Sequence, residues 1–86
     1  MIKLVVIGRR WFDKHYGNTY HRVFLLDTTT GIWHTSDIEY GYGKQYRQTA
    51  YELAKEHLQF QGDYLEFIHD PQVEFFVSDV ARKRDL

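Results

Sequence analysis

The chain contains no cysteine and a single proline among its 86 residues. Without cysteine it can form no disulfide bond, no thiolate nucleophile and no cysteine-ligated zinc site, a composition that suits a reducing compartment. No apolar stretch approaches the roughly 20 residues that a membrane span requires, and the apolar run at residues 2–7 is too short for a signal peptide. We therefore expect a cytoplasmic protein that binds no membrane.

Neither sign of charge is in large excess. The 11 Lys and Arg residues stand against 12 Asp and Glu residues, for a net charge of −1, which argues against a strongly basic nucleic-acid binder and against a strongly acidic DNA mimic. The charges are unevenly spread: residues 1–26 carry +4 and residues 61–80 carry −5. This polarity can steer a partner, but we favour mutual neutralisation by neighbouring strands.

The composition predicts one packed core. Hydrophobic residues make up 43% of the chain and aromatic residues 17%, which is far from the composition of a disordered protein. A chain of this length is too short for two independent cores. We expect a single α+β domain over residues 1–80, followed by a basic and mobile C-terminal tail at residues 81–86.

Periodicity and turn residues predict the order of elements. Three strands joined by turns open the chain, and we place them at residues 2–12, 19–26 and 32–38. An amphipathic helix follows at residues 46–58, with its apolar face at Tyr46, Ala50, Leu53, Ala54 and His57. Residues 60–70 fit a strand or, as we favour, a short helix that Pro71 ends. Alternation at residues 72–80 predicts a last strand.

These elements define the expected fold class. It is α+β, with a four-stranded, mainly antiparallel sheet. Along the chain the elements are three strands, a helix, a short helix and a last strand. One amphipathic helix packed on one face of the sheet is the simplest way to bury the apolar stripes. A sheet of this size also has edges that can pair between copies, so a homodimer is possible.

Several short motifs resemble a known group of sequences. They are Arg9-Arg10-Trp11-Phe12, Gly17-Asn18-Thr19-Tyr20-His21, Tyr40-Gly41-Tyr42-Gly43 and the ending Arg82-Lys83-Arg84-Asp85-Leu86. In these motifs the chain resembles small uncharacterised proteins encoded by bacteriophages and prophages, a group to which no activity is attached. The resemblance implies a bacterial host cytoplasm as the setting, and by analogy a role in binding a host or defence protein.

The run Tyr40-Gly41-Tyr42-Gly43 precedes the predicted helix and has two interpretations. Glycines allow close backbone approach, and free amides at a helix start can hold a phosphate. However, the run lacks the nucleotide-binding glycine fingerprint and the lysine of a P-loop. We favour a sheet-to-helix joint, with Tyr40, Tyr42 and Tyr46 as candidate partner contacts.

The first hairpin supplies the other candidate partner-binding residues, which are Arg9, Arg10, Trp11, Tyr20 and His21. Strand alternation sends Arg10 to one side and Arg9 with Trp11 to the other, so that one face presents cations beside aromatic rings. This pattern is typical of protein interfaces and of single-stranded nucleic-acid binding. The alternative is a purely structural role, in which Trp11 and Phe12 complete the core while the arginines cover its rim.

Catalytic and metal sites have weak support. The five histidines, His15, His21, His34, His57 and His69, show no recognised ligand spacing. We predict no metal, no cofactor and no catalytic residue. The leading hypothesis is a non-enzymatic protein that docks on a host or phage protein. A weak single-stranded nucleic-acid binder, or a small ribonuclease built from His21, Arg9, Arg10 and Tyr20, is the alternative.

Overall fold

A long antiparallel hairpin forms the centre of the sheet in the computed structural model, which describes residues 1–86. Its strands are β1 (Leu4–Asp13) and β2 (Asn18–Asp27). Strands β3 (Ile32–Thr35) and β4 (Glu39–Tyr40) both pair antiparallel with β2, and β5 (Val73–Val80) pairs in parallel with β1. The order across the sheet is β3-β2-β1-β5, with β4 also beside β2. The predicted α+β class with a mostly antiparallel sheet is confirmed.

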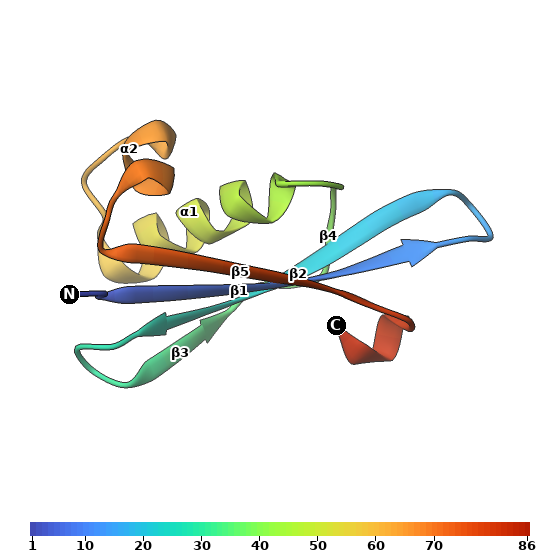
Figure 1. Ribbon diagram of the computed structural model, residues 1–86, viewed down its shortest axis with the longest axis horizontal. Coiled ribbons are helices and arrows are strands. Elements are labelled where there is room, and N and C mark those ends of the chain that lie inside the picture. The colour runs from blue at the N-terminus through green and yellow to red at the C-terminus, as the bar shows by residue number, and fades with distance from the viewer.

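Both helices lie on the same side of this sheet (Figure 1). Helix α1 (Gln45–Leu58) begins one residue before the predicted start, and α2 (Tyr64–His69) confirms the short second helix. A capping box begins α2, because the Asp63 carboxylate accepts from the Glu66 amide at 2.8 Å. Neither helix has the length and apolarity needed to cross a bilayer.

The predicted third strand is interrupted at Ser36, so the sheet has five strands rather than four. The Ser36 amide donates to the Val23 carbonyl at 2.9 Å, and the Val23 amide donates to Ser36 Oγ at 2.9 Å. A side-chain oxygen therefore replaces the backbone acceptor that a continuing strand would supply. The chain leaves the sheet after Thr35 and pairs with β2 again only at Glu39–Tyr40.

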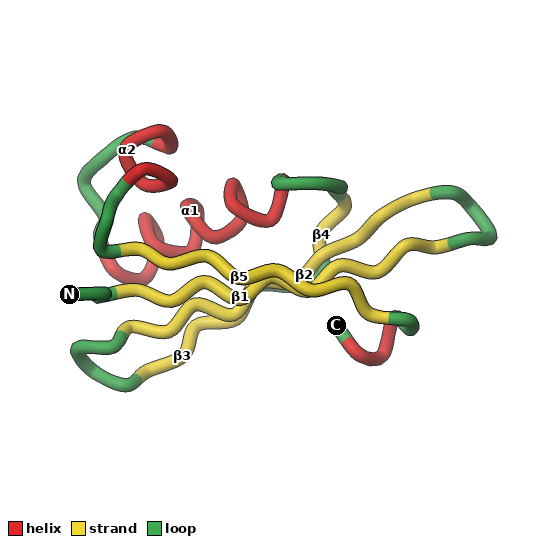
Figure 2. Tube along the Cα trace, viewed as in Figure 1, coloured by secondary structure: helices red, strands yellow, loops and turns green.

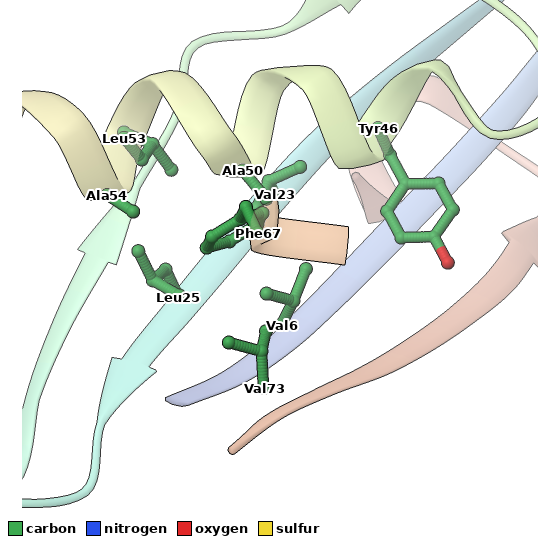
Figure 3. Close-up of a cluster of buried hydrophobic side chains, with 9 residues drawn as sticks. All are labelled: Val6, Val23, Leu25, Tyr46, Ala50, Leu53, Ala54, Phe67 and Val73. Carbon is green, nitrogen blue, oxygen red and sulfur yellow. The ribbon is translucent and has the colours of Figure 1, made fainter. Parts of the chain in front are cut away.

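The core lies between the helices and one face of the sheet (Figure 3). Its buried members are Val6, Val23, Leu25, Tyr46, Ala50, Leu53, Ala54, Phe67 and Val73. They come from three strands and both helices, and the sheet members occupy alternate positions along their strands. The alternation explains why Val6 is buried beneath α1 while its neighbours in β1 point to the other face.

The end of the chain folds back instead of extending as a tail. A short η1 turn (Lys83–Asp85) follows β5, and the side chain of Leu86 is only 6% exposed. The η1 turn lies on the side of the sheet opposite the two helices, as Figure 2 shows.

Gly8 lies directly under Tyr46, the second residue of α1. A Cβ atom at position 8 would lie 2.6 Å from Cδ2 and 2.8 Å from Cγ of the Tyr46 ring. Cγ and Cδ2 lie close to the backbone of Tyr46, and Tyr46 is only 3% exposed. The tyrosine therefore has no free space into which it can move, and β1 tolerates no side chain at this point.

We predict that Gly8→Ala destabilises the protein by about 1–3 kcal/mol, the usual cost of overpacking a filled core. Urea unfolding measures this loss. Because alanine is otherwise the better strand residue, the same change in a Tyr46→Ala background should be neutral or stabilising. An equal loss in both backgrounds would show that the ring is not the obstacle.

Candidate binding surface

The face of the sheet opposite the helices is largely uncovered, and we call it the open face. Only the η1 turn lies on this side (Figure 1). Directly paired residues of neighbouring strands point to the same face, so the pairing register identifies its members. They are Val5, Ile7, Arg9, Trp11, Asp13, Asn18, Tyr20, Arg22, Phe24, Leu26, Trp33, Thr35, Tyr40, Glu74, Phe76, Ser78 and Val80.

One half of the open face is apolar. This apolar half consists of Val5, Ile7, Phe24, Leu26, Trp33 and Phe76. Ile7 lies between Phe24 on β2 and Phe76 on β5, and Trp33 and Phe76 are 50% and 51% exposed. With strands about 4.8 Å apart and a rise of about 3.3 Å per residue, the apolar half, from Val5 to Ile7 across four strands, spans about 200 Å². The largest exposed apolar patch of a monomeric protein is often a functional contact.

Three aromatic rings cross the other half of the open face in a line, which we call the aromatic row. They belong to Trp11 on β1, Tyr20 on β2 and Tyr40 on β4. The ring centroids of Trp11 and Tyr20 are 5.9 Å apart, and those of Tyr20 and Tyr40 are 5.8 Å apart. The Trp11 and Tyr20 rings are stacked with 25° between their planes, while the Tyr40 side chain is 64% exposed.

Beside the aromatic row lie two arginines, which we call the arginine pair. Arg9 and Arg22 are directly opposite each other on β1 and β2. The Arg9 guanidinium lies 4.8 Å from the Phe24 ring centroid and donates to the Asp85 carbonyl at 3.3 Å. Arg22 Nε donates to the Ser36 carbonyl at 3.0 Å. Neither arginine forms an ion pair with a carboxylate, so both keep an uncompensated charge.

Arg10 belongs to the opposite face and supports the fold. Its Nε lies 2.7 Å from Asp79 Oδ1 on β5, and its Nη1 donates to the Gly43 carbonyl at 2.9 Å. The guanidinium thereby ties the loop before α1 to the first and last strands. The Arg10–Asp79 ion pair joins the basic first strand to the acidic last strand, as the neutralisation hypothesis expects.

His21 and Tyr46, two of the predicted partner contacts, are in the core instead. Their side chains are 1% and 3% exposed and cannot reach a partner. His21 Nδ1 lies 3.2 Å from the Gly41 carbonyl oxygen, to which it must donate because carbonyls only accept. Its Nε2 lies 2.6 Å from the Thr49 hydroxyl on α1. The burial of Tyr46 agrees with its place on the apolar face of the predicted helix, whereas the sequence could not show the burial of His21, which depends on where α1 lies.

The run Tyr40-Gly41-Tyr42-Gly43 is the joint between β4 and α1. The backbone φ of Gly43 is 62°, a left-handed conformation that glycine adopts readily. The Gln45 amide already donates to the Tyr42 carbonyl at 3.1 Å, so it is not free to hold a phosphate. Tyr42 is 76% exposed and is not part of the aromatic row, but it lines a shallow depression with Tyr40, Lys44 and Tyr64.

The structure separates the residues of the hypothetical ribonuclease. His21 and Arg10 belong to the face under the helices, whereas Arg9 and Tyr20 belong to the open face. Among the other histidines, the rings of His34 and His57 stack with centroids 4.8 Å apart. The structure places no three metal-ligating side chains together.

The structure adds residues that the sequence interpretation missed. Arg9, Trp11, Tyr20 and Tyr40 were predicted as contacts and do lie together on the open face. The added members are Phe24, Leu26, Trp33 and Phe76. The unbroken apolar run at residues 23–26 could have indicated Phe24 and Leu26, because a strand that is apolar at every position has two apolar faces.

Compared with known proteins, the chain matches no family model, no curated protein and no solved structure.

We predict that Thr49→Val destabilises the protein by about 1–3 kcal/mol, because His21 Nε2 then loses its partner in a buried site. Thr49→Ser keeps the hydroxyl and should retain most of the stability. Urea unfolding of both variants measures the difference. Equal stabilities would mean that the Thr49 hydroxyl does not support His21.

Proposed function

We propose that the protein is a non-enzymatic binding protein that docks another protein against the apolar half of the open face. The observation that carries the proposal is the exposure of Trp33 and Phe76 at the two sides of an uncovered apolar sheet. Aromatic side chains at the centre of a desolvated contact commonly dominate the affinity of protein interfaces. The arginine pair then lies at the rim of the contact, where charge improves the rate and specificity of docking.

A second copy of the chain is a poorer occupant than a different protein. Between Val5 and Trp11 the open face carries two arginines and, at its edge, one carboxylate, that of Glu74. Pairing two whole open faces would enclose four guanidinium groups with two carboxylates, and unpaired buried charge is strongly unfavourable. A different protein can supply the missing carboxylates.

The sequence resemblance to bacteriophage and prophage proteins supports a choice of partner. Small phage proteins of that kind often bind and alter host proteins, so we place the partner among host or defence proteins of a bacterial cytoplasm. This choice rests on analogy. The apolar half of the open face supports docking whichever host protein is the partner.

Phe76→Glu tests the proposal, because it places a charge in the middle of the contact. We expect at least a tenfold loss of affinity, or about 1.4 kcal/mol, for the partner. The matched control is Phe12→Glu, since Phe12 is 53% exposed and belongs to the other face of the sheet. Both variants are first compared with the unmodified protein by urea unfolding.

The measurement has two steps. Proteins captured from a bacterial lysate by the unmodified protein and by Phe12→Glu, but not by Phe76→Glu, are identified and purified, and their affinities are then measured by calorimetry. If no captured protein depends on Phe76, docking at the apolar half is wrong. If light scattering shows a dimer that Phe76→Glu dissociates, the occupant is a second copy and not a different protein.

A further inference from the structure

The aromatic row carries three rings on which bases can stack, with the Trp11 and Tyr20 planes 25° apart and the exposed Tyr40 ring turned edge-to-face to Tyr20 at 77°. Its rings come from three strands at nearly equal steps of 5.9 Å and 5.8 Å, so that the row runs across the strands and not along one of them. Flat aromatic rings on a sheet accept nucleobases by stacking, and because every base has a π-face this contact tolerates any sequence. The row therefore offers successive positions for unpaired bases.

The arginine pair runs alongside the row in the same direction. On β1, Arg9 is two residues before Trp11, and on β2, Arg22 is two residues after Tyr20. All four side chains point to the same face. Two residues of a strand cover about 7 Å. The arginine pair therefore lies about 7 Å to one side of the aromatic row. In a nucleic acid the phosphates are likewise displaced to one side of the flat bases.

The charge around this end of the open face is positive. The η1 turn brings in Arg82, Lys83 and Arg84, which are all exposed, and the acidic residues are Asp85 in this turn and Asp13 at the end of β1. Asp79, the nearest acid on β5, is already paired with Arg10 on the other face. No carboxylate forms an ion pair with either residue of the arginine pair, so an anionic ligand would supply the missing negative charge.

We infer that the aromatic row and the arginine pair bind a short single-stranded nucleic acid that crosses β1, β2 and β4 with its bases on Trp11, Tyr20 and Tyr40 and its phosphates at Arg9 and Arg22. This site goes beyond the proposed protein docking, because it uses the aromatic row in the other half of the open face and shares only the arginine pair with the rim of the protein contact. Double-stranded nucleic acid does not fit it, because paired bases cannot expose their faces to the row. An acidic peptide would satisfy the arginines but leaves the row without a role.

The experiment uses fluorescently labelled oligothymidylate and oligouridylate of about ten nucleotides, a usual length for one such site. We expect both to bind at low salt, and the log of the affinity to fall with log salt at a slope between about −1.4 and −3.5, as two to five phosphate contacts predict. The DNA and RNA probes together show whether the 2′-hydroxyl contributes. Fluorescence anisotropy measures the affinities.

Two kinds of variant separate stacking from charge. Tyr40→Ala removes an exposed ring and should weaken binding about tenfold with the salt slope unchanged. Arg22→Gln should lower the magnitude of the slope by about 0.7. The controls are Phe12→Ala, which removes an exposed ring on the other face, and Lys55→Gln, which removes one exposed cation from α1. Both should alter binding less than twofold.

Tryptophan fluorescence gives a second readout. The chain has two tryptophans, Trp11 and Trp33, so Trp33→Phe leaves Trp11 as the reporter of the row. A base stacked on Trp11 should quench this fluorescence, whereas inorganic pyrophosphate, which has charge but no base, should not.

Four results would overturn the site. They are no binding of either probe at about 100 µM protein and low salt, equal effects of the variants and their controls, no quenching on binding, or equally good competition by polyglutamate, which would assign the arginines to an acidic protein. Phe76→Glu separates this inference from protein docking. It should abolish capture of the protein partner and leave oligonucleotide binding intact.

Discussion

The contact of Tyr46 with Gly8 fixes the position of α1 on the sheet. Because β1 has no side chain at position 8, the first turn of the helix lies close against the strand. The loop before the helix is held at the same end by Arg10, which donates to the Gly43 carbonyl, and by His21, which donates to the Gly41 carbonyl. These contacts explain why several polar and aromatic residues of the hairpin serve the fold and not a binding surface.

The one long helix of this chain covers one face of the sheet. The apolar residues of the other face therefore stay accessible to solvent. Strand alternation divides the hairpin so that Val6 and Val23 are enclosed while Ile7 and Phe24 are not. The open face is therefore a consequence of the same packing that makes the core. Its two halves differ because apolar residues dominate one end of β1 and β2, whereas arginines and aromatic rings dominate the other.

Local sequence patterns predicted much of this surface. Alternation alone placed Arg9 with Trp11 and sent Arg10 to the opposite side, and the pairing register agrees. Burial was harder to predict, since His21 looks no different in the sequence from Tyr20 and Tyr40. A polar or aromatic residue is enclosed only if a distant segment covers it, and for His21 that segment is α1 with Thr49.

The sequence by itself determined β1, β2, both helices and β5, because turn residues, helical periodicity, strand alternation and the Asp63 capping box act over a few residues. It also determined that no cysteine chemistry operates. Only the tertiary structure decided that β5 lies parallel to β1, that β4 returns to β2 after Ser36, and that one apolar face of the sheet is left open. These features arise from contacts between segments far apart in the chain, whose geometry no short stretch of sequence encodes.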